Sequence, residues 1–400
     1  MAEITKEQIV EFKEEESQAK DAQDYIILAE SISKTLDDND WAKKLLEEAE
    51  KLAIDEDNPL DRYIDIAELA ADNESLGNKD YAKEIYKKLE EYSEKTKLLK
   101  RINTSKSFWL KILGESIAKD NSLGDKVWAK ELYQKAVELQ IVEGSGAPSD
   151  PGAEYQDIGD WNGLAESISK SLGDNDWAKE LFQKSIDLAE YTVDYCSIAE
   201  SIMNSIGNID YTTKVLQIAE QKSKDFNDYI ILAENASKFI SYESAINYYQ
   251  LAISTAEQFL KKGLDYQECE FTEDSYFNYI SNMFSSINAY IYSDNEDYLG
   301  KLKDNDSSLA KSLVNSMYGK LESILETKSD IVSTSNKNYA IQNISIGAFL
   351  NRDLIQKIVE SSVPIEDKSD AKELREFIST SNLSNEDKKR IIELSLLKTK

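Results

Sequence analysis

The chain has 400 residues, is rich in helix-forming residues and contains only 14 glycines and 4 prolines, which excludes a turn-rich β protein and favours an extended helical array or several helical units. Its net charge of −29 repels nucleic-acid backbones and anionic membranes and attracts basic partners, although such a charge also serves solubility alone. Histidine is absent, and Cys196 and Cys269 are too few for a disulfide framework or a cysteine-based zinc site. We therefore expect no metal and no other cofactor.

The N-terminal stretch predicts no targeting signal. Residues 1–16 are acidic and lack a long apolar run, which is not the pattern of a signal peptide. No stretch approaches the roughly 18 consecutive apolar residues of a membrane span. We expect a cytoplasmic protein that does not bind membranes, in which residues 1–23 form one acidic helix. This helix either caps an array or is the second helix of a degenerate unit.

A two-helix unit recurs from residue 24 onward. An apolar residue and a small residue precede a glutamate in six places, with an aromatic or apolar residue four positions before the small one. Because these offsets lie on one face of a helix, they predict that the small residue lets a second helix approach closely. The small residues are Ala29, Ala67, Gly114, Ala165, Ala199 and Ala233, and the residues four positions earlier are Tyr25, Tyr63, Leu110, Trp161, Tyr195 and Tyr229.

A turn and a second helix follow each first helix. Glycine in the sequences LGNKD, LGDKV, LGDND and IGNID suits a left-handed residue after a helix end. Asp40, Asp80, Asp176 and Asp210 are predicted to cap the second helix. The second helix has the spacing small-x3-large-x2-small, as in Ala42, Leu46 and Ala49; Ala82, Tyr86 and Leu89; Ala129, Tyr133 and Ala136; Ala178, Phe182 and Ser185; Thr212, Leu216 and Ala219; and Ala245, Tyr249 and Ala252.

These positions resemble the tetratricopeptide repeat over residues 24–257, in six units. Alanine replaces the glycine of the family in five units, the turn between the helices is longer in most of them, and the closing proline is missing. The resemblance implies an all-α, right-handed α-solenoid of helix–turn–helix repeats with additional C-terminal helices. It also implies a surface along the first helices that holds a segment of a partner protein.

The predicted organisation follows from the spacing of the units. After the N-terminal helix, residues 24–141 hold repeats 1–3 and residues 161–257 hold repeats 4–6. Residues 142–160 contain two of the four prolines and four glycines, which predicts a flexible loop or hinge. Residues 258–400 are predicted to be helical, either as degenerate repeats or as a separate domain, with an aromatic-rich helix near 276–287.

The position after each small residue is a glutamate, and a lysine stands four residues further on in four units. The structural interpretation is helix stabilisation by Glu–Lys pairs, and the functional one is a row of carboxylates that binds a basic or amphipathic protein segment. Both interpretations remain open. The candidate partner-binding residues are Glu30, Lys34, Glu68, Glu115, Lys119, Glu166, Lys170, Glu200, Asn204, Glu234 and Lys238.

Other patterns favour structure over chemistry. The aspartates of 37–40 do not have the ligand spacing of a calcium loop, and the aromatic residues at the start of the second helices favour packing. No catalytic or phosphate-binding motif is present, so we expect no enzyme and no direct nucleic-acid binding. We expect an adaptor, scaffold or regulatory partner of another protein. The alternative is an acidic inhibitor that blocks a basic, nucleic-acid-binding site on its target.

Overall fold

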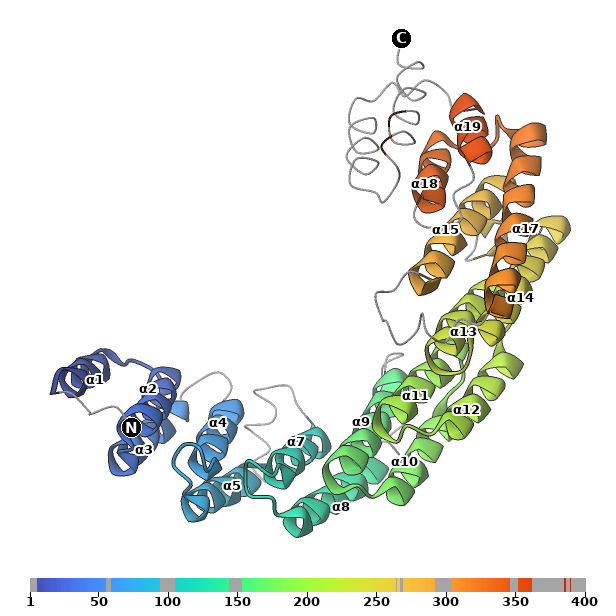
Figure 1. The fold of residues 1–400 in the computed structure, drawn as a ribbon. Helices are drawn as coiled ribbons and strands as arrows, with labels where there is room; N and C mark the ends of the chain where they lie inside the picture. Colours follow the sequence, from blue (N-terminus) through green and yellow to red (C-terminus); the bar gives the residue numbers. More distant parts are fainter. Residues whose placement is uncertain are drawn as a thin grey trace. The chain divides into compact units, whose positions relative to one another are not determined.

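The computed structural model describes residues 6–54, 59–93, 105–143, 153–263, 265–266, 269–291, 304–345 and 352–361, together with Asn385 and Lys389 (Figure 1). The chain divides into two compact units, of which the first comprises Met1–Ala189 with Asn204–Gly207 and the second comprises Glu190–Met203 with Asn208–Lys400. Consecutive helices pack in pairs, which confirms the predicted all-α array of helix pairs. In the described part of the chain, no helix is long and apolar enough to cross a membrane.

The described residues of the first unit form a single helix followed by four helix pairs. The pairs are α2 with α3, α4 with α5, α7 with α8, and α9 with α10, and each pair also packs against the next one. The bounds are α1 Lys6–Gln18, α2 Ala22–Leu36, α3 Asn39–Ala53, α4 Pro59–Ala71, α5 Lys79–Ser93, α7 Lys106–Ala118, α8 Lys126–Glu143, α9 Ala153–Leu172 and α10 Asn175–Leu188.

The core of each pair is built from the small and large residues that the repeat predicts. Ala82, Tyr86 and Leu89 on α5 are fully buried, as are Ala178 and Phe182 on α10. The close approach of the helices is clearest in the third pair, where a Cβ atom on Gly114 would lie 3.1 Å from the ring of Tyr133. The small residue of the first helix therefore faces the large residue of the second.

Glycines with a left-handed backbone lie in the turns that follow four first helices, as the turn sequences predict. Gly77, Gly124, Gly173 and Gly207 all have φ between 61° and 71°, and Asp37 takes this role in the first pair with φ of 54°. An L residue with a side chain is strained in this region, which explains the recurrence of glycine.

The predicted N-caps are wrong by two residues. The second helices begin earlier, so that Asp40, Asp80, Asp176 and Asp210 lie in the first helical turn, where their charge is favourable near the positive end of the helix dipole. The observed cap is the aspartate or asparagine that stands two residues before each predicted one, and its side chain accepts a backbone N–H of the helix. In the third pair, for which no cap was predicted, the equivalent residue is Asp125. The caps observed are Asp38, Asn78, Asp125, Asp174 and Asn208.

Two predicted boundaries also differ. Residues 153–160 were expected to be loop, but they form the first turns of α9, because Ile158 and Trp161 are three positions apart and are both buried on one face. The rest of the predicted loop that follows α8, residues 144–152, lies outside the described residues. In the N-terminal region α1 ends at Gln18, and Asp21 caps a new helix by accepting the Asp24 N–H at 2.9 Å.

The second unit begins with α11 Thr192–Ser205, most of which belongs to it, and continues with α12 Ile209–Lys222, α13 Phe226–Phe239 and α14 Tyr242–Lys262. A two-residue antiparallel ladder follows, formed by β1 Asp265–Tyr266 and β2 Cys269–Glu270. The remaining described helices are α15 Glu273–Ile291, α17 Asp304–Lys328, α18 Thr334–Ser345 and α19 Arg352–Ser361. Of residues 362–400, only Asn385 and Lys389 belong to the described part of the chain.

The C-terminal helices share one hydrophobic core with the last helix pair. Its buried residues run from Phe226 on α13 to Ile358 on α19, so in the described residues this region is continuous with the array. The order of packing changes, because α15 packs most extensively on α18 and less on α17. The aromatic-rich helix predicted near 276–287 is α15, and its Tyr276, Phe277 and Phe284 are buried in this core.

Candidate functional site

The six glutamates of the predicted row occupy equivalent positions on first helices. In the first unit Glu30 lies on α2, Glu68 on α4, Glu115 on α7 and Glu166 on α9; in the second unit Glu200 lies on α11 and Glu234 on α13. Each follows the buried small residue that contacts the second helix. All are partly exposed, and Glu200 is the most open.

Glu68 belongs to a polar network that joins two helix pairs. Its Oε1 accepts hydrogen bonds from the hydroxyl of Ser116 on α7, at 2.6 Å, and from the ammonium of Lys119, the residue after α7, at 2.7 Å. The hydroxyl of Tyr86 lies 2.7 Å from Ser116 Oγ and 2.8 Å from Ser122 Oγ. Burial raises the pKa of Tyr86 to about 12. This glutamate therefore serves the stacking of the second and third pairs.

The same arrangement recurs one pair further along. The hydroxyl of Ser167 on α9 donates to Glu115 Oε1 on α7, and Tyr133 donates to Ser171 at 3.1 Å. In the second unit Ser286 on α15 donates to Glu234 at 3.4 Å. Three glutamates of the row thus each accept a hydrogen bond from a serine on the following first helix or on α15. The sequence did not predict these pairs, because the two residues of each pair are about 50 positions apart.

The lysines of the row do not all behave alike. Lys34 and Lys170 pair with Glu30 and Glu166 on their own helices, each at 2.6 Å. The hydrogen bond that Lys34 donates to Glu30 raises the pKa of Lys34. Lys119 was expected to pair with Glu115, but it bridges back to Glu68 instead. Asn204 and Lys238 are exposed at the ends of α11 and α13. The first and fourth pairs therefore keep their charged residues on the surface of one helix.

A second row of carboxylates, on second helices, is used for stacking. Glu16 on α1 accepts the indole N–H of Trp41 at 3.1 Å, and Glu90 on α5 accepts that of Trp128 at the same distance. Glu50 on α3 pairs with Lys88 at 2.5 Å. The contact between α1 and Trp41 is equivalent to the contact between α5, a second helix, and Trp128. Helix α1 therefore occupies the position of a second helix in front of the first pair.

The aromatic residues at the start of the second helices are covered by lysines from the preceding pair. Lys43 lies 5.2 Å from the ring centre of Tyr81, Lys83 lies 6.0 Å from that of Trp128, and Lys130 lies 5.5 Å from that of Trp177. These cation–π contacts agree with the predicted packing role of the rings. The second helices thus devote much of their polar surface to their neighbours.

We expect the network around Glu68 to contribute to stability. Replacing Ser116 with alanine removes a buried hydroxyl between Tyr86 and Glu68, and the expected loss in the free energy of unfolding is about 1–2 kcal/mol. The matched control is Ser31→Ala, because Ser31 occupies the same repeat position but donates only to the Ile27 carbonyl of its own helix, at 2.9 Å. Urea unfolding followed by circular dichroism measures both variants. Equal stability of the two variants would contradict a stacking role for the network.

Among the described residues, no group of three or more Cys, Asp and Glu side chains is arranged to hold a metal ion. Cys196 is buried on α11, and burial raises the pKa of its thiol to about 12, which keeps it protonated and unreactive near neutral pH.

A cavity that sequence reasoning missed lies between α1 and α2. Its volume is about 320 Å³, and it is open to solvent. No repeat pattern pointed to it, because α1 lies before the first recognisable repeat. The residues that line the cavity are Glu15, Gln18, Ala19, Asp24, Ile27, Leu28 and Ser31.

Comparisons with known proteins add little to this description. No family model matches the chain, and no curated protein matches it. Among solved structures the chain is similar to one described as "Circular tandem repeat protein with novel repeat topology and enhanced subunit contact surfaces", with 16% sequence identity, coverage of 94% of this chain and 90% of that chain, and a TM-score of 0.31. The helical-repeat assignment rests on the paired helices and their cores.

Proposed function

We propose that the protein is a non-enzymatic, tetratricopeptide-type scaffold or adaptor that binds a basic or amphipathic segment of another protein along its first helices. The observation that carries the proposal is the contrast between the two helices of a pair. The second helices place their carboxylates and lysines against neighbouring pairs. On the first helices Glu30–Lys34 and Glu166–Lys170 stay accessible to solvent, as does Glu200.

The composition of the first helices supports this choice of partner. A partner segment with lysine or arginine would meet the accessible carboxylates Glu30 and Glu166 of the first unit or Glu200 of the second unit, and affinity would come from several modest contacts. The net charge of −29 would speed the encounter with a basic partner at low ionic strength. The cytoplasm remains the proposed location.

The test is charge reversal on the first helices. The variant Glu166→Lys with Glu200→Lys is expected to weaken binding of the cognate partner about tenfold, because two attractive charges become repulsive. The control is Glu131→Lys with Glu180→Lys, which makes the same change in net charge at exposed positions on the second helices α8 and α10. Isothermal titration calorimetry gives the affinity, and circular dichroism checks that helicity is kept. Equal affinity of both variants would refute the role of the first helices.

A second candidate is favoured by the net charge alone. The acidic surface would occupy a basic cleft of a target protein and so exclude nucleic acid. This function predicts strong weakening of the complex by salt and competition with DNA or RNA for the same target. At ~0.5 M salt the Debye length is only a few ångström, so attraction between charged surfaces is largely screened. A complex that persists at ~0.5 M salt and does not compete with DNA or RNA for the target favours the scaffold function.

A further inference from the structure

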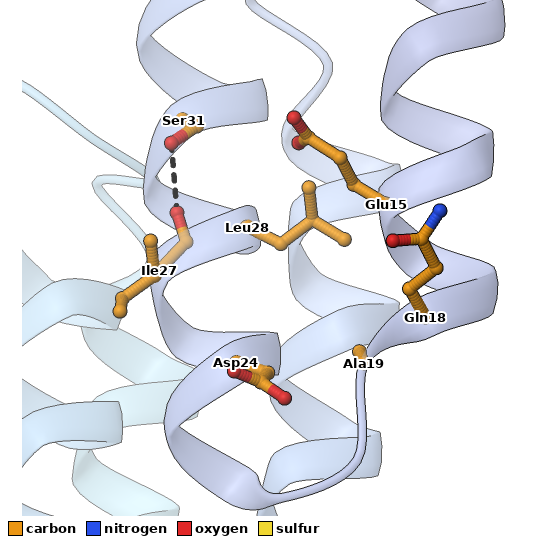
Figure 2. Close-up of a pocket in the computed structure, with 7 residues that line it drawn as sticks. All are labelled: Glu15, Gln18, Ala19, Asp24, Ile27, Leu28 and Ser31. Carbon is orange, nitrogen blue, oxygen red and sulfur yellow. Dashed lines mark hydrogen bonds between the residues drawn. The ribbon is translucent and has the colours of Figure 1, made fainter.

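The cavity between α1 and α2 differs in kind from the row of glutamates. Leu28, which is 4% exposed, forms an apolar wall, and Ala19, the residue after α1, adds a second apolar side chain to the lining. In Figure 2 the Leu28 side chain extends from α2 toward Glu15 and Gln18 on α1, and Asp24 lies below it on α2, at the level of Ala19 in this view. The space therefore has an apolar wall and carboxylates at its edge.

The two carboxylates are not equally available. One oxygen of Asp24 accepts the backbone N–H of Lys20 at 2.9 Å, which fixes this side chain where the chain enters α2. In the described residues no cationic side chain pairs with Glu15, and α1 has no fully buried residue. Glu15 can thus turn toward a positive group placed in the cavity, and Asp24 adds a second negative charge close by.

From this lining we propose that the cavity is a docking site for a lysine or arginine side chain of a partner protein, carried on an amphipathic segment. The aliphatic stem of such a residue would lie on Leu28 and Ala19, and its charged end would meet Glu15 and Asp24. A cavity of about 320 Å³ also has room for an apolar neighbour of that residue beside Ile27, which is 53% exposed. The proposal rests on the proposed function, since it supplies a specific anchor for the same kind of partner.

A defined probe tests the site on the full chain. The probe is the amphipathic peptide acetyl-LKKLLKKLLKKL-amide with a fluorescent label, compared with the acidic peptide acetyl-LEELLEELLEEL-amide and with a version of the first peptide in which serine replaces each leucine. Fluorescence anisotropy measures affinity, and hydrogen exchange measures protection of residues 6–31. We expect the lysine–leucine peptide to bind and to slow exchange in α1 and α2, and the other two peptides to bind at least about fivefold more weakly.

Matched variants separate the site from general charge attraction. Glu15→Lys is expected to reduce the affinity for the probe about fivefold and to abolish the protection of residues 6–31. Glu14→Lys changes the same charge on the neighbouring exposed residue, which does not line the cavity, and should leave both readouts near wild type. Loss of the same size in both variants, no protection of residues 6–31, or equal binding of all three peptides would overturn the proposal.

The outcome is distinguishable from failure of the proposed function. If Glu166→Lys with Glu200→Lys weakens the cognate partner while Glu15→Lys does not, the scaffold function stands and the cavity proposal fails. If Glu15→Lys alone weakens the partner, the cavity is the anchor and the row on the first helices is refuted as a binding surface.

Discussion

Replacing Phe182 with alanine is expected to lower the free energy of unfolding by about 3–5 kcal/mol. Phe182 is the large residue of the second helix in the fourth pair, and its side chain is completely buried on α10. Truncation removes the transfer energy of the ring and leaves a cavity that rigid, paired helices fill only in part. Urea unfolding monitored by circular dichroism gives the change.

The control for Phe182 is on the same helix. Leu188 is 46% exposed on α10, so Leu188→Ala should change the stability by about 0.5 kcal/mol or less. Because a repeat contacts mainly its neighbours, hydrogen exchange in Phe182→Ala should accelerate most in α9 and α10. Similar losses in the two variants would show that the large repeat position is not a core position.

Replacing Phe226 with alanine should be comparably damaging in the second unit, by about 3–5 kcal/mol. Phe226 is 1% exposed at the start of α13, and its ring centre lies 5.4 Å from that of Phe259, 4.9 Å from Phe271 and 4.4 Å from Tyr279. Such ring pairs add to the free energy of burial. The loss should appear in thermal and urea unfolding.

The matched change for Phe226 is Tyr339→Ala, which also truncates an aromatic residue but at a position on α18 that is 54% exposed. We expect it to be close to neutral. Equal stability of Phe226→Ala and Tyr339→Ala would contradict the conclusion that α13 and the C-terminal helices share one hydrophobic core.

The sequence was sufficient to predict the helix pairs because their cores depend on short, local spacings. Alanine or glycine in one helix and a large residue in the next recur at fixed offsets, as Gly114 and Tyr133 illustrate. Local rules also explain the error in the N-caps. The segment Asp38-Asn39-Asp40 offers two aspartates with the same chemistry, and only the observed bond from the Trp41 N–H to Asp38 distinguishes them.

The features that escaped prediction depend on contacts between distant residues. The partner of Glu68 is Ser116, 48 positions away, and no pattern within one repeat reveals that bond. The preference of α15 for α18 over α17 is likewise a matter of tertiary packing, as is the cavity beside α1. The positions of the glutamates in the candidate row could therefore be predicted from the sequence. The stacking contacts of Glu68 and Glu115 could not.

Cross-linking of the complex between this protein and its captured partner tests the central claim most directly. An amine-reactive reagent followed by mass spectrometry locates the lysines that lie near the partner. We expect cross-links at Lys34, Lys170 and Lys238 on the first helices and at Lys119 directly after α7, all of which are exposed. Cross-links concentrated on exposed lysines of the second helices, such as Lys44, Lys87 and Lys214, with none on the first helices, would contradict the claim.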